Sequence, residues 1–76
     1  MNKYRRNRLQ KIYEAISAIQ ADLEEVRDEE QEAFDNMPED LQYSERGEAI
    51  ENALSELEDA LYSMEEMLEH IESASE

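Results

Sequence analysis

The chain has 76 residues with one glycine, one proline and no cysteine, and its seven basic and 22 acidic residues give a net charge of −15. This length suits one domain with a thin core, and the scarcity of helix breakers favours an all-α fold. Without cysteine, disulfides and thiolate metal sites are excluded. No apolar run is long enough for a signal peptide or a membrane span, so we expect a cytoplasmic protein without membrane contact.

Charge is segregated along the sequence. Residues 1–11 hold five of the seven basic residues, and the remaining 65 residues combine two basic residues with all 22 acids, a net charge of −20. Such acidity disfavours direct contact with nucleic acid or anionic lipid and favours basic partners. Acidity that only keeps the protein soluble is the alternative.

A first helix is predicted from about residue 2 to residue 35. Large apolar residues recur at alternating gaps of three and four, which is the spacing of the a and d positions on a helix that faces another helix. The a positions are Leu9, Ile16, Leu23 and Glu30, and the d positions are Ile12, Ile19, Val26 and Ala33. Glu30 interrupts this otherwise apolar pattern.

A turn is predicted over residues 36–43. Pro38 disfavours helix in the residue before it, and Asn36 tolerates turn conformations. We expect Leu41 and Tyr43 to fold back over the end of the hairpin.

A second helix is predicted from about residue 44 to residue 73. Ser44 is the candidate N-cap, and Gly47 costs helix propensity and so indicates close packing. The a positions are Leu54, Leu61 and Leu68, and the d positions are Ile50, Leu57, Met64 and Ile71.

The two helices are expected to pair as one antiparallel, coiled-coil-like hairpin over residues 1–76. Pairing a with d across the hairpin places Leu9 against Ile71 and Leu23 against Leu57, with the apex near Asp40, where the turn is predicted independently. On one flank every e position of the second helix is glutamate. The expected e-position pairs are Arg6 with Glu72, Arg27 with Glu51, Gln20 with Glu58 and Tyr13 with Glu65.

The apolar stripe is wider than a two-helix interface needs. The second helix adds small or apolar residues at g, and the first adds two aromatic side chains. We therefore expect a homodimer that forms a four-helix bundle, with a monomeric hairpin as the alternative. The expected self-association residues are Ala53, Ala60, Met67, Tyr13 and Phe34.

No residue pattern indicates an enzyme, a cofactor or a metal site. The histidine of a di-iron motif would need glutamate three residues earlier, and Met67 stands there before His70. Glu66 and His70 offer at most half of a weak divalent site, and a solvated histidine is the favoured interpretation. Two paired helices also lack the pocket that separates the pKa values of an acid–base pair.

Two nucleic-acid-related interpretations remain. Residues 3–11 resemble a basic binding arm, although internal pairing with the acidic second helix is favoured. The acidic rod has a charge spacing near that of duplex DNA and predicts a mimic that fills the groove of a basic, nucleic-acid-binding protein. A structural oligomerisation module is the alternative. The expected partner-binding residues are Asp22, Glu25, Asp28, Glu51, Glu58, Asp59, Glu65, Glu66 and Glu69.

Residues 29–61 carry a resemblance to a known group of proteins. The matching strings are residues 32–36 (EAFDN), 38–39 (PE) and 44–49 (SERGEA), followed by an acidic heptad helix. This segment, somewhat under half of the chain, resembles a stretch in small uncharacterised acidic helical proteins of bacteriophages and mobile elements in Gram-positive bacteria. The resemblance implies no activity and no functional residue. It does imply a setting in which inhibitors of host nucleic-acid machinery, of anti-CRISPR or anti-restriction type, are expected.

Overall fold

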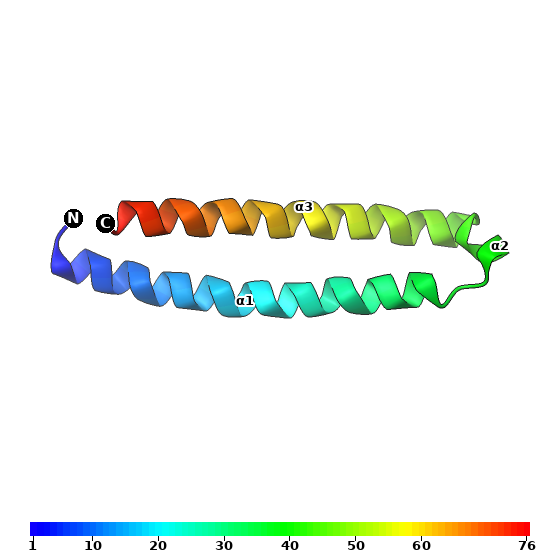
Figure 1. Ribbon diagram of the computed structural model, residues 1–76, viewed down its shortest axis with the longest axis horizontal. Coiled ribbons are helices and arrows are strands. Elements are labelled where there is room, and N and C mark those ends of the chain that lie inside the picture. The colour runs from blue at the N-terminus through cyan, green and yellow to red at the C-terminus, as the bar shows by residue number, and fades with distance from the viewer.

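The computed structural model describes all residues 1–76 as three helices and no strands. Two long helices, α1 (Lys3–Asp35) and α3 (Glu45–Ala74), run antiparallel, and the single turn of α2 (Glu39–Gln42) lies in the connection between them (Figure 1). The result is a rod of 58 × 15 × 12 Å with both termini at the end opposite α2. The expected all-α helical hairpin is thereby confirmed. No helix has an apolar stretch long enough to cross a membrane.

The helix boundaries follow from capping side chains. The Asn2 side chain accepts a hydrogen bond from the Arg5 backbone N–H at 2.8 Å and begins α1. Ser44 begins α3 in the same way, with its hydroxyl accepting from the Gly47 backbone N–H at 3.3 Å, which confirms the predicted N-cap. Both ends lie within a residue or two of the predicted ones.

The turn is closed by a polar side chain and by a glycine. Gln42 Nε2 donates to the carbonyl oxygens of Phe34 at 3.1 Å and Met37 at 3.2 Å, and so ties α2 to the end of α1. Leu41 and Tyr43 are 48% and 84% exposed, so the expectation that they cover the hairpin end is wrong. Their place against the backbone is taken by Gln42, because its amide satisfies carbonyls that apolar side chains would leave unpaired.

Gly47 confirms the predicted close packing. It is buried, and a Cβ at this position would lie 2.7 Å from the Leu41 carbonyl oxygen and 2.6 Å from the Gln42 carbonyl carbon. No side chain fits there without movement of the α2 backbone. The glycine therefore sets how closely α2 folds onto the start of α3.

The two helices contribute unequally to the core. The buried side chains are the α3 leucines Leu54, Leu61 and Leu68, which are 7%, 9% and 7% exposed, and α1 has no buried residue. The predicted d positions of α1 face away from α3. Ile12, Ile19 and Val26 are 45%, 58% and 49% exposed.

The predicted a/d pairing surface of α1 is therefore wrong at its d positions. The half-buried residues of α1 include the a positions Leu9, Ile16 and Leu23 together with the e positions Tyr13 and Phe34. The aromatic side chains at e supply large apolar areas, which favours turning this side of α1 inward. The heptad spacing fits the observed rotation of α1 about its axis as well as the predicted one. In the observed rotation the d residues lie on one broad side of the rod.

Candidate interaction surfaces

The hairpin has two different flanks, and the first carries the polar contacts between α1 and α3. Gln20 Nε2 on α1 donates to Glu65 Oε2 on α3 at 3.2 Å. Further along, Arg27 shares a groove with Glu58, and towards the termini Tyr13 shares one with Ile71 and Glu72. We call this side, with Tyr13, Gln20 and Arg27 opposite Glu58, Glu65 and Glu72, the polar flank.

The pairing on the polar flank lies one heptad from the predicted one. Gln20 contacts Glu65 and not Glu58, and Arg27 lies near Glu58 and not Glu51. Helical side chains lean towards the N-terminus of their own helix, and in an antiparallel pair these directions are opposed. Gln20 therefore leans towards Glu65, which leans back towards it, while Glu58 leans away.

Neither expected ion pair between the helices forms. The one salt bridge of the structure joins neighbours on α1, with Arg27 Nε donating to Asp28 Oδ1 at 2.7 Å. This hydrogen bond is the main cause that raises the pKa of Arg27 above its ordinary value, with smaller contributions from nearby carboxylates such as Glu58. Arg6 is exposed near the start of α1 and has no carboxylate partner, so the predicted pairs of Arg6 with Glu72 and of Arg27 with Glu51 are wrong.

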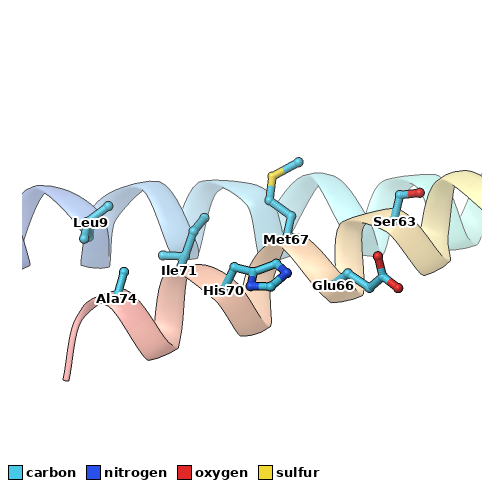
Figure 2. A pocket seen from close by; sticks show the side chains of 7 residues that line it. All are labelled: Leu9, Ser63, Glu66, Met67, His70, Ile71 and Ala74. Carbon is cyan, nitrogen blue, oxygen red and sulfur yellow. The ribbon is translucent and has the colours of Figure 1, made fainter.

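The other flank is an open apolar groove between α1 and α3. Its lining includes Leu9, Met67, Ile71 and Ala74, and its volume is about 440 Å³. Figure 2 shows Ile71 and Met67 reaching from α3 towards α1, whereas Glu66 and His70 lie over the α3 ribbon. Leu9 and Ile71 share this groove, as the predicted a-to-d pairing requires.

Exposed apolar residues of both helices border this groove. Leu9 also lines a shallow pocket with Arg5 and Ile12, which places the d stripe of α1 on the same side as Met67. Met67 is 47% exposed, and the other g residues of α3 on this side are small and exposed. We call this surface the open face; it comprises Ile12, Ile19 and Val26 of α1 and Ala53, Ala60 and Met67 of α3.

The predicted self-association residues are divided between the two flanks. Ala53, Ala60 and Met67 are exposed on the open face, and Met67 also lines its groove. Tyr13 is half-buried on the polar flank, and Phe34 is half-buried beside the turn, where its carbonyl oxygen accepts from Gln42. These two aromatic residues support the hairpin itself. The heptad pattern assigned Ile12, Ile19 and Val26 to the interior, and the structure leaves them about half exposed on the open face.

All nine predicted partner-binding carboxylates are exposed. Three have neighbours within the chain, since Asp28 pairs with Arg27, Glu65 accepts from Gln20, and Glu58 lies near Arg27. The other six, Asp22, Glu25, Glu51, Asp59, Glu66 and Glu69, make no hydrogen bond or ion pair. The carboxylates are spread over both long helices and do not converge on one point.

The hairpin has no cluster of side chains that could hold a metal ion. Nowhere do three His, Asp or Glu side chains lie close enough together to hold a metal ion, and Glu66 and His70 share only the rim of the open groove. No protein-family model, curated protein or solved structure matches the chain.

Proposed function

We propose that the protein is an acidic interaction module that occupies the nucleic-acid-binding groove of a basic protein. The observation that supports this most is the density of charge along a straight rod. Twenty-two acids along 58 Å amount to about one carboxylate per 2.6 Å, and the net charge of −15 to about one negative charge per 3.9 Å, whereas duplex DNA carries about one charge per 1.7 Å of its axis.

The shape of the molecule favours the same function. Carboxylates on paired helices are held on a rod 15 × 12 Å across, within the width that a nucleic-acid groove accepts, whereas a disordered acidic tail would have to be ordered on binding. A host-directed inhibitor of anti-CRISPR or anti-restriction type is the kind of activity that this proposal covers.

The test is competition with DNA. The protein is immobilised, proteins captured from bacterial lysate are identified, and each purified partner is challenged with a short duplex. We expect the duplex and the protein to exclude each other from the partner, and we expect affinity to fall steeply as salt rises. Simultaneous binding of duplex and protein, or affinity that is independent of salt, would exclude mimicry.

Matched variants separate specific carboxylates from bulk charge. Glu66→Gln with Glu69→Gln removes two charges from the predicted binding surface, and Glu39→Gln with Asp40→Asn removes two from α2 at the turn. The first pair is expected to weaken partner binding about tenfold and the second pair much less. Equal losses would mean that net charge alone determines binding.

A structural self-association module is the second candidate function. The open face supports it, because the isoleucine, valine and methionine side chains on it are about half exposed, which is typical of a surface that another molecule covers. The two candidates are compatible, since a dimer that uses the open face leaves most carboxylates outside.

A further inference from the structure

No part of the chain covers the open face, and the charges beside it indicate what kind of molecule would. Residues 3–19 of α1 hold five basic residues and one acid, a net charge of +4, whereas residues 20–35 hold one basic residue and eight acids, a net charge of −7. No basic residue of the first half forms an ion pair within the hairpin. The first half of α1 is thus a cationic surface that α3, with ten acids, does not pair with.

We propose that two copies of the chain pack open face to open face, with α1 antiparallel to α1 of the partner subunit. The two-fold axis passes between the two copies close to Ile19 and Ala60. The cationic first half of each α1 then lies along the acidic second half of the other, and this attraction occurs twice in the dimer. This inference rests on the second candidate function, self-association through the open face, and is independent of the proposed binding to a basic protein.

The spacing of apolar residues on the open face fits this symmetry. Ile19 is seven residues from Ile12 and seven from Val26, and Ala60 is seven from Ala53 and seven from Met67. Rotation about the axis therefore brings Ile12 to the partner's Val26. On α3 it brings Ala53 to the partner's Met67, so a small side chain meets a large one at each end.

The proposed two-fold axis lies beside both α1 and α3 near the middle of the rod. Leu9 and Ile71 share a groove, and ten residues further towards the turn the two helices hold Ile19 and Leu61, so residue 60 lies within about a turn of Ile19 along the rod. At the outer edge of the face, Arg8 comes within one residue of the level of the partner's Glu29. Arg8 lies 5.6 Å over the Tyr4 ring and has no carboxylate in the hairpin.

The other symmetric arrangement is disfavoured by charge. If the rods packed in parallel, α1 would lie on the partner's α3. Its cationic first half would then meet residues 60–74, which contain four acids, but its acidic second half would meet residues 45–59, which contain six acids and one arginine. The repulsion at the second contact exceeds the attraction at the first, whereas in the proposed dimer the attraction between the two α1 helices exceeds the repulsion between the two α3 helices.

Single cysteine substitutions test the geometry, because the chain has no cysteine of its own. Ile19→Cys and, separately, Ala60→Cys are expected to form disulfide-linked dimers under mild oxidation, since each thiol faces its own copy across the axis. Ile12→Cys is the matched control and is expected to cross-link only when Val26→Cys is added to the same chain.

Each other cross-linking outcome contradicts the proposal. Cross-linking of Ile19→Cys only in combination with Ala60→Cys would indicate the parallel arrangement. Equal cross-linking of Ile12→Cys and Ile19→Cys alone would indicate random collision. A wild-type chain that stays monomeric by light scattering at high micromolar concentration would exclude the dimer.

Charge reversal tests the electrostatic part. Arg8→Glu is expected to weaken dimerisation about tenfold, because it places like charges opposite each other at two symmetric positions. Glu29→Arg should weaken it similarly, and the two changes together should restore it while circular dichroism shows unchanged helix content. A double variant weaker than either single one would overturn the antiparallel pairing of α1 with α1.

Discussion

The two long helices have the same periodicity and differ in how they use it. α3 buries three leucines at a positions and has small residues on its open flank, whereas α1 buries no residue and leaves two isoleucines and a valine about half exposed. Within the hairpin one side of α3 is therefore fully covered, whereas the apolar side chains of α1 are only partly covered. An isolated hairpin explains the sequence of α3 better than it explains that of α1.

The largest expected effect comes from charging the core of α3. Leu61→Asp should abolish folding, because it buries a charge without a partner in a core that supplies only about 3–5 kcal/mol. Ile19→Asp is the comparison on α1 and should keep a helical circular dichroism spectrum in dilute solution. Loss of helix in both variants would mean that the two helices depend equally on the same core.

Truncation to alanine makes the same comparison quantitative. Leu61→Ala should lower the free energy of unfolding by about 2–5 kcal/mol, as for other buried leucines. Ile19→Ala should cost below about 1 kcal/mol at concentrations where the chain is monomeric, and more where it self-associates. Thermal melts over a range of concentrations would measure both.

Gly47→Ala tests the contact between α2 and α3. In an open helix the change would stabilise by about 1 kcal/mol through propensity. Here the added Cβ would lie 2.7 Å from the Leu41 carbonyl oxygen, so we expect a loss of about 1–3 kcal/mol. Ser55→Ala at an exposed α3 position is the control, and a stabilising Gly47→Ala would show that α2 is free to move away.

Glu30→Leu should improve the inner face of α1. Glu30 is half-buried at an a position, so an apolar side chain gains buried area and removes one charge from an acidic stretch. We expect a gain of about 1 kcal/mol in the free energy of unfolding. A loss in urea titrations would show that the carboxylate has a favourable contact there.

The smallest effect should come from the polar flank. The hydrogen bond from Gln20 to Glu65 is exposed and should contribute about 0.5 kcal/mol. A double-mutant cycle with Gln20→Ala and Glu65→Ala isolates this pair from the general repulsion among acids. A coupling energy near zero would mean that the polar flank is compatible with the register of α1 against α3 but does not help to determine it.

The hairpin was predictable because several patterns in the sequence agree. The heptads of both segments, Pro38 between them and the capping residue Ser44 each indicate two antiparallel helices with an apex near residue 40. Close packing at Gly47 was predictable too, because glycine costs helix propensity and is expected inside a helix where a neighbouring backbone leaves no room for a side chain. The leucines at a of α3 form its core, as their spacing indicates.

The sequence did not determine which side of α1 faces α3. The a/d spacing of α1 fits more than one rotation of the helix about its axis; it is carried by Leu9, Ile12, Ile16 and Ile19. The rotation that forms depends on Tyr13 at e and on the α3 side chains that α1 contacts. The pairing of Gln20 with Glu65 was missed because residue spacing does not include the lean of side chains along each helix. Arg27 was assigned to a distant glutamate although Asp28 lies next to it.

The position of the two termini at one end of the rod has a mechanical consequence. A force applied between them pulls α1 and α3 apart sideways, so the contacts of Leu9, Leu68 and Ile71 carry the load first and those near Gly47 carry it last. The contacts between α1 and α3 therefore break one after another from the termini towards the turn, which requires only a low force. Force applied between one terminus and the turn would instead act along the axis of a single helix and load the hydrogen bonds of all its turns together, so the molecule resists stretching in this direction more than in the other.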